Sequence, residues 1–160
     1  MSILSKGGLR EALLDFVHNE KPVWGTCAGL ILLSKGVPGR DSALEKLDAL
    51  DVEVERNYYG RQLESFQGPI ELTGALKSSH KDYQEVQEMV FIRAPGISKI
   101  GEGVHVLATR TTSSGTQQAV AVQQGNIIGT TFHPELSESW DWHHYFLHLT
   151  IQHSRQVTVT

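Results

Sequence analysis

Residues 22–30 read Pro-Val-Trp-Gly-Thr-Cys-Ala-Gly-Leu, and this stretch decides the fold class. Its apolar part at 23–26 follows a proline and predicts a short buried strand, while the apolar run at 28–34 predicts a buried helix. Cys27 lies between them, at the centre of a Gly-x-Cys-x-Gly pattern. A tight turn from strand to helix needs small neighbours and presents a nucleophile with its backbone exposed to a ligand. The stretch therefore predicts a cysteine elbow in an α/β domain.

The position of Cys27 suits nucleophilic chemistry. A helix N-terminus beside the sulfur favours the thiolate over the thiol, because aligned peptide dipoles stabilise negative charge there. The backbone N–H of Ala28 is placed to donate to an oxyanion that develops on the substrate. The alternative is that this one cysteine of the chain is a small buried hydrophobic residue, as most free cysteines are.

A thiol nucleophile needs a base, and the base needs an orienting group. Thr-Phe-His-Pro-Glu at residues 131–135 supplies both. His133 and Glu135 are two residues apart after a predicted strand, so extended geometry would place them on one side. A carboxylate there fixes the imidazole tautomer and stabilises the imidazolium that forms as the thiol ionises. The sequence therefore predicts a Cys27–His133–Glu135 catalytic triad.

The rest of the chain alternates between helical and extended patterns. Apolar spacing predicts helices over 8–19 and 140–152, the latter with Trp142, Tyr145, Phe146 and Leu149 on its apolar side. Strands are expected at 52–57, 69–72, 89–94 and 104–109, and a hairpin at 119–123 and 127–132. Loops are expected at 36–41, 77–88 and 111–115. This order, without repeats or a linker, predicts a single α/β domain over residues 1–160.

Composition excludes several classes of function. The chain has 160 residues, of which 39% are hydrophobic and 20% charged, which is typical of a globular domain. A formal charge of −4 gives no electrostatic reason to expect nucleic acid or an anionic membrane as partner. One cysteine cannot form an intramolecular disulfide, which favours a reducing compartment, and we expect a cytoplasmic protein. His144 and His148 are four apart without a supporting Glu or Cys, so we expect no metal or other cofactor.

With these motifs identified, the sequence resembles a known family. The segments around Cys27 and His133 are similar to triad-type, class I glutamine amidotransferases. Two further segments are more specific: residues 55–66, Glu-Arg-Asn-Tyr-Tyr-Gly-Arg-Gln-Leu-Glu-Ser-Phe, and residues 91–95, Phe-Ile-Arg-Ala-Pro. They resemble the glutaminase subunits of pyridoxal 5′-phosphate synthase, and Phe-Val-His-Asn at 16–19 is similar to the fungal members. The resemblance implies a flavodoxin-like three-layer sandwich and one glutamine amidotransferase domain.

The resemblance also implies a mechanism. Cys27 would attack the carboxamide of L-glutamine and form a γ-glutamyl thioester, while His133 and Glu135 would manage the protons. Arg56, Ile92 and Arg93 match family positions that hold glutamine, and a guanidinium suits the substrate carboxylate. The family passes ammonia to a separate synthase subunit, which forms a large ring assembly and builds the vitamin B6 coenzyme. The implied partners are therefore L-glutamine and that synthase subunit.

The start of the chain departs from the family pattern. Members carry a first strand and a Gly-Gly-Glu-Ser/Thr segment that supplies part of the oxyanion hole, whereas Gly7-Gly8 here is followed by Leu9. Residues 1–4 resemble the helix after that motif, so we expect a family member without its first strands. Loss of one oxyanion donor typically costs about 2.7–4 kcal/mol of transition-state stabilisation. Two alternatives follow: a pseudo-glutaminase that only binds the synthase, or another cysteine hydrolase with the same elbow.

Overall fold

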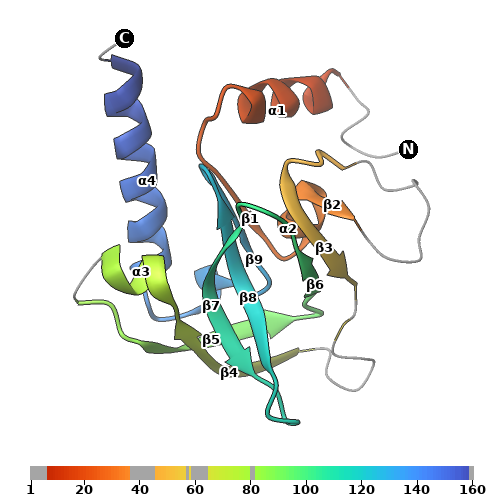
Figure 1. Cartoon of the computed structure of the whole chain (residues 1–160), viewed down its shortest axis with the longest axis vertical. Coiled ribbons are helices and arrows are strands. Elements are labelled where there is room, and N and C mark those ends of the chain that lie inside the picture. Colours follow the sequence, from red (N-terminus) through yellow and green to blue (C-terminus); the bar gives the residue numbers. More distant parts are fainter. Residues whose placement is uncertain (1–6, 37–45, 57, 59–64, 80–81, 159–160) are drawn as a thin grey trace.

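The computed structural model describes residues 7–36, 46–56, 58, 65–79 and 82–158. Within them the chain forms a mixed α/β fold with two sheets (Figure 1). This confirms the fold class predicted from the cysteine elbow. Residues 1–4 and most of the loop predicted at 36–41 lie outside the described residues. So does Asn57, the predicted end of a strand.

The larger sheet has six strands in the order β1-β9-β8-β7-β4-β5. Their bounds are β1 Val23–Thr26, β4 Ser65–Leu72, β5 Val86–Ile92, β7 His105–Thr111, β8 Gln117–Gln124 and β9 Ile127–Thr130. β1 pairs with β9 in parallel, and the other neighbours pair antiparallel. The parallel pair matters most for function, because it brings the residue after β1 beside the segment after β9.

The smaller sheet has three strands in the order β2-β3-β6. β2 Ser34–Gly36 runs parallel to β3 Leu50–Glu55, and β6 Gly96–Ile100 runs antiparallel to it. The sequence patterns missed β2 and β6. Ser34 was predicted to end a helix, but α2 Ala28–Leu33 stops one residue earlier and the chain extends. β6 follows Pro95, where the patterns predicted that the preceding strand ends.

The apolar core lies on both faces of the larger sheet. One cluster packs α4 Asp141–Thr158 against the sheet and includes Phe91, Phe132 and Trp142, each at most 1% exposed. The other joins α2 to β3 and β8 through residues such as Leu30 and Val122, which are fully buried. In Figure 1, α4 and α1 Leu9–His18 stand on different sides of the strands. The predicted helices at both ends of the chain are confirmed.

The prediction of a polar loop over 77–88 is partly wrong. α3 Gly74–Ser79 covers its start and β5 covers its end. The helix is held by Leu76, which is fully buried. In β5, Gln87 and Met89 are buried while Val86 and Glu88 are exposed, as expected for an edge strand with one covered face. Because one of the inward positions of this edge strand is the polar Gln87, the sequence shows no clear alternation of apolar and polar residues at its start.

Candidate active site

The elbow at Cys27 is formed by a strained backbone. Cys27 has φ 47° and ψ −101°, a region that residues with a side chain rarely adopt. Its N–H donates to the Thr130 carbonyl at 2.8 Å, which continues the pairing of β1 with β9 by one residue. A Cβ at Gly25 would lie 2.5 Å from Leu33 Cδ1, so only glycine fits there. A Cβ at Gly29 would meet nothing within 4 Å, so the prediction of an obligatory small residue is confirmed only at Gly25.

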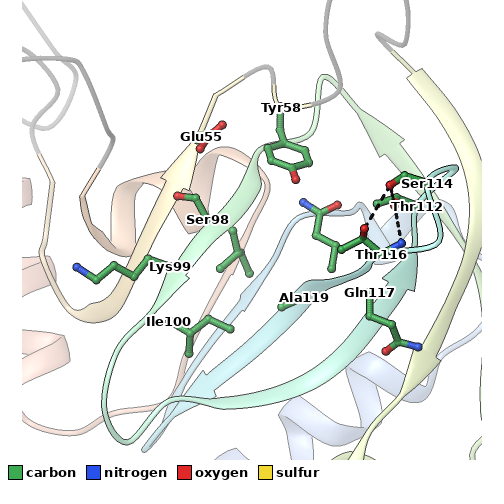
Figure 2. Close-up of a pocket in the computed structure, with 12 residues that line it drawn as sticks. Glu55, Tyr58, Ser98, Lys99, Ile100, Thr112, Ser114, Thr116, Gln117 and Ala119 are labelled. Carbon is green, nitrogen blue, oxygen red and sulfur yellow. Dashed lines mark hydrogen bonds between the residues drawn. The ribbon is translucent and has the colours of Figure 1, made fainter.

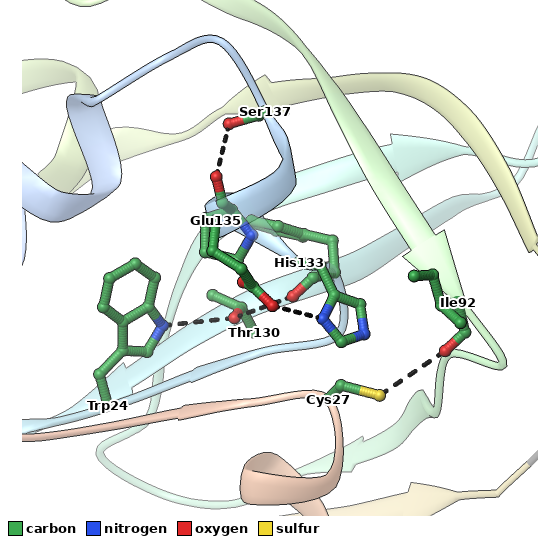
Figure 3. A network of polar contacts seen from close by, with 9 residues as sticks. Trp24, Cys27, Ile92, Thr130, His133, Glu135 and Ser137 are labelled. Atoms are coloured by element: carbon green, nitrogen blue, oxygen red, sulfur yellow. Dashed lines mark hydrogen bonds and ion pairs between the residues drawn. The ribbon is translucent and has the colours of Figure 1, made fainter.

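Three segments that are distant in sequence meet at this elbow (Figure 3). The first is the turn from β1 to α2 with Cys27, whose Sγ donates to the Ile92 carbonyl at 3.7 Å. The second is the end of β5, which carries Ile92. The third follows β9, where the His133 N–H donates to the Val90 carbonyl at 2.8 Å. In Figure 3 the sulfur and the His133 ring face the same space beside Ile92.

The structure brings His133 and Glu135 together. His133 Nδ1 lies 2.7 Å from Glu135 Oε1, with 20% and 50% of the two side chains exposed. The backbone differs from the extended geometry that was predicted: β9 ends at Thr130, and Glu135 lies in a 3-10 turn, Pro134–Leu136. The turn, rather than a strand, folds the carboxylate back onto the ring. A hydrogen bond at Nδ1 leaves Nε2 free to act as base.

Glu135 is held in its charged form. Burial favours the neutral carboxyl, but the hydrogen bond and charge of His133, the backbone and the charge of His143 outweigh it and lower the pKa of Glu135 below its ordinary value. An ionised carboxylate is what an orienting group for an imidazole requires.

The pKa of Cys27, by contrast, is shifted towards the neutral thiol. Burial raises the pKa of the thiol, and the charge of Glu135 adds to this, whereas the Ala28 amide and the charge of Arg93 lower it. The Ala28 amide at the start of α2 lowers the pKa as predicted for a helix N-terminus, but burial outweighs it, so the net direction is towards the thiol. The bond to the Ile92 carbonyl also needs the protonated sulfur. Ionisation must come from transfer of the proton to a base.

The residues that the family resemblance assigned to glutamine are placed unequally. Ile92 touches the sulfur, and Arg93 follows it, exposed and with a φ of 46°. Arg56 follows β3 and is exposed, and no hydrogen bond or ion pair among the described residues joins it to Cys27, His133 or Glu135. Most of the arginine-glutamine segment, residues 59–64, lies outside the described residues.

Sequence reasoning missed the aromatic support behind the site. Trp24 Nε1 donates to Thr130 Oγ1 at 3.3 Å, which ties β1 to the end of β9. The Trp24 ring packs edge-on against His143 in the first turn of α4, with ring centroids 5.3 Å apart. Trp24 lies in the predicted strand of the elbow motif, but no spacing rule connects it to a histidine more than a hundred residues later.

A separate open cavity of about 610 Å³ lies between β6 and the β7–β8 hairpin (Figure 2). Tyr58 and Lys99 lie on one side of it and Thr112 and Thr116 on the other. Its lining in the described chain does not include the cysteine, His133 or Glu135, so the polar groups of the elbow are distinct from it. His144 and His148 are exposed as expected, and among described residues no three His, Cys, Asp or Glu side chains gather as metal ligands do.

Comparison with known proteins decides the family. The model of the SNO glutamine amidotransferase family matches residues 1–152. The chain belongs to this family. The pyridoxal 5′-phosphate synthase subunit PdxT of Corynebacterium jeikeium is 41% identical over 150 residues, covering 94% of this chain and 71% of that protein. The probable synthase subunit PDX2 of Arabidopsis thaliana is 39% identical, covering 87% of this chain and 62% of that protein.

A solved structure gives the same family. A crystal structure of a glutamine amidotransferase superimposes with a TM-score of 0.76 and 36% identity, over 92% of this chain and 70% of that chain. The resemblance to glutaminase subunits of this synthase is thereby confirmed, while the likeness to fungal members stays a prediction. Within the described part of the chain, no helix is both long and apolar enough to span a membrane.

Proposed function

We propose that this chain is the glutaminase subunit of a pyridoxal 5′-phosphate synthase. It hydrolyses L-glutamine to L-glutamate and ammonia, and the ammonia is used by the synthase subunit to build vitamin B6. The observation that carries the proposal is the His133–Glu135 pair, 2.7 Å apart, held by backbone bonds beside the strained Cys27 elbow in a member of a glutamine amidotransferase family. The synthase as partner is supported by the relatives, which are subunits of this synthase.

The geometry supports the following roles. His133 takes the thiol proton, and Cys27 Sγ attacks the carboxamide carbon of glutamine to form a tetrahedral oxyanion. The Ala28 N–H, already directed at the sulfur, donates to that oxyanion. His133 then protonates the departing nitrogen as the C–N bond breaks, which leaves a thioester and ammonia. Finally His133 activates water, which cleaves the thioester to glutamate and restores the thiol.

Proton transfer between cysteine and histidine is central to this scheme. Because burial raises the pKa of Cys27 and Glu135 stays ionised, the resting pair holds a thiol, and the carboxylate stabilises the imidazolium formed on transfer. We assign Arg93 the binding of the substrate's α-carboxylate, which a guanidinium suits, and this role is supported by its closeness to the thiol, whose pKa its charge lowers. We assign Arg56 the same carboxylate-binding role. We also propose a single domain and a cytoplasmic location, the latter supported by the lone cysteine.

The test is ammonia release from L-glutamine by the full chain mixed with purified synthase subunit. Wild type is expected to release ammonia, and Cys27→Ala is expected to lose the activity completely because the sequence has one cysteine and a thioester needs its sulfur. His144→Gln, a change of an exposed histidine, is the matched control and should keep wild-type turnover. Equal activity of Cys27→Ala and wild type, or an inert wild type with partner present, would contradict the proposal.

The alternative of a non-catalytic binding protein is not supported, because the family model and the solved structure that match the chain are those of glutamine amidotransferases. No observation favours another cysteine hydrolase.

A further inference from the structure

Thr130, the last residue of β9, contacts the backbone on both sides of the candidate active site. Its carbonyl accepts the N–H of Cys27 at 2.8 Å. Its hydroxyl donates to the carbonyl of Phe132 at 3.5 Å, and Phe132 directly precedes His133. Thr130 is fully buried. One residue therefore joins the segment of the nucleophile to the segment of the base.

The Thr130 hydroxyl is oriented by a tryptophan of the elbow strand. Trp24 Nε1 donates to Thr130 Oγ1 at 3.3 Å, and Figure 3 shows the indole nitrogen directed at this hydroxyl. A hydroxyl has one proton to donate, so the oxygen that accepts from Trp24 can still donate to the Phe132 carbonyl. The indole is itself held, because its ring packs against Phe146 and His143 of α4 at centroid distances of 5.7 Å and 5.3 Å. The hydrogen bonds thus run in one direction, from Trp24 through Thr130 to Phe132.

The peptide unit before His133 is held at both of its polar atoms. Its carbonyl belongs to Phe132 and accepts the Thr130 hydroxyl, while its N–H belongs to His133 and donates to the Val90 carbonyl at 2.8 Å. Because a peptide unit is planar and includes the following Cα, these two bonds fix the point from which the imidazole side chain starts. The pairing of β9 with β8 ends at Thr130, so beyond it individual hydrogen bonds have to hold the chain.

The neighbouring Thr131 shows that burial alone does not explain Thr130. Both residues are fully buried. In the described part of the chain the Thr131 hydroxyl has no hydrogen-bond partner, whereas the Thr130 hydroxyl makes the two bonds given above. Valine has nearly the shape of threonine, so packing alone would be served by valine at either position. The difference between the two threonines is therefore that the hydroxyl at 130 is used.

Resting on the proposed glutaminase function, we propose that Thr130 is a positioning residue for the reaction: its carbonyl holds Cys27, and its hydroxyl, oriented by Trp24, holds the peptide of His133. It acts through these two residues and is assigned no contact with the substrate. Its hydroxyl keeps the base in place relative to the sulfur for the proton transfers that occur in every turnover. Loss of the hydroxyl should therefore slow the chemical steps and leave glutamine binding unchanged.

The test is kcat and KM for ammonia release by the full chain with the synthase subunit. We expect Thr130→Val to lower kcat on the order of 10-fold, since a misplacement of about 1 Å can cost 100-fold, and to leave the KM for glutamine unchanged. Thr130→Ser keeps the hydroxyl and should recover most of kcat. Trp24→Phe keeps a ring but removes the donor, so it should lower kcat in the same way but less. Thr131→Val is the matched control and should turn over as wild type does.

Three results would overturn the proposal. The first is a Thr130→Val variant with the kcat of wild type. The second is a Thr130→Ser variant as slow as Thr130→Val, because the hydroxyl would then not be the acting group. The third is an equal loss in Thr131→Val, which would show that both threonines matter only through packing. Trp24→Phe keeps the test decisive if Thr130→Val fails to fold, because an unchanged kcat in that variant also contradicts the proposal.

A second measurement does not depend on turnover. Amide hydrogen exchange of the free chain should show the His133 N–H exchanging roughly fivefold faster in Thr130→Val, the effect of one weak hydrogen bond, relative to amides of β8. Thr130→Ser should restore the wild-type rate. If wild type with the synthase subunit releases no ammonia but His133 responds in this way, the glutaminase function has failed and the positioning by Thr130 stands. An unchanged His133 rate in folded Thr130→Val overturns the positioning whatever the activity.

Discussion

At the scale of single residues, the site depends on two strained backbone positions. Cys27 and Arg93 both adopt positive φ, at 47° and 46°. Cys27 donates a hydrogen bond from its sulfur to the Ile92 carbonyl, and Arg93 is the residue after that carbonyl. Strain of this kind costs of order 1–3 kcal/mol per residue and persists where the surrounding structure enforces it. Here the hydrogen bond from the Cys27 N–H to Thr130 and the pairing of Val90 with His133 supply that enforcement.

The reactivity of Cys27 with iodoacetamide should reveal the balance of burial and charge. Because burial raises the pKa of Cys27, the alkylation rate should rise with pH around a midpoint above that of an ordinary cysteine, since only the thiolate reacts. Arg93 lowers this pKa, so Arg93→Gln should move the midpoint further upward. Arg155→Gln, near the end of α4, should leave it unchanged. A midpoint below the ordinary cysteine value in wild type would contradict the burial argument.

The candidate site was predictable to the extent that its chemistry is local in sequence. Cys27 lies within a recognisable elbow, and His133 and Glu135 are two residues apart, so motif and spacing were enough to name them. The contact between Ile92 and the sulfur depends on how β5 is placed in the sheet, which no local pattern specifies. The contact of the His143 ring with Trp24 was also not predicted, because the two residues lie on different elements.

At the scale of elements, the junction of β1 and α2 requires one glycine. In Gly25→Ala the new Cβ would lie 2.5 Å from Leu33 Cδ1 and 2.7 Å from the Gly29 backbone. We expect a loss of about 1–3 kcal/mol in the free energy of unfolding, the usual range for overpacking. Chemical denaturation measures it. Gly29→Ala is the matched control, since its Cβ would meet nothing within 4 Å, and alanine in a helix should be neutral or stabilising by roughly 0.5–1 kcal/mol.

If Gly25→Ala were as stable as wild type, the close contact between residue 25 and Leu33 would be contradicted. The two substitutions also differ in what they should do to Cys27. A displaced α2 moves the Ala28 amide away from the sulfur, whereas the open side of Gly29 leaves the elbow in place.

Elements were predictable where one face of a periodic segment is buried. The hairpin of β8 and β9, with its turn at Gly125 and Asn126, and the aromatic side of α4 follow that rule. β2 and β6 were not predictable in this way, because they belong to a short three-stranded sheet whose register depends on β3. The start of β5 was missed for a related reason: at the edge of a sheet, polar residues replace apolar ones on the open face.

At the scale of the whole molecule, stability is distributed unevenly around the site. β8 runs through the middle of the larger sheet and contributes fully buried residues to both core clusters, Val120 and Ala121 to one and Val122 to the other. α1 has no buried residue, and it meets the second cluster only through partly buried Leu13 and Leu14. The cysteine elbow lies between these extremes, because among the described strands β1 is at the edge of the larger sheet and pairs with β9 alone.

Hydrogen exchange should resolve this gradient. Opening of α1 exposes only the partly buried Leu13 and Leu14, whereas the amides of β8 can exchange only when both clusters open, so β8 should report global unfolding. We expect α1 amides to exchange on the order of 100-fold faster than those of β8 after correction for intrinsic rates, a difference of about 3 kcal/mol in opening free energy. β1 should fall between them. If α1 were as protected as β8, the partial contacts of Leu13 and Leu14 would have to join the helix to the cooperative core, and the elbow would then be stabilised from the α1 side as well as through β9.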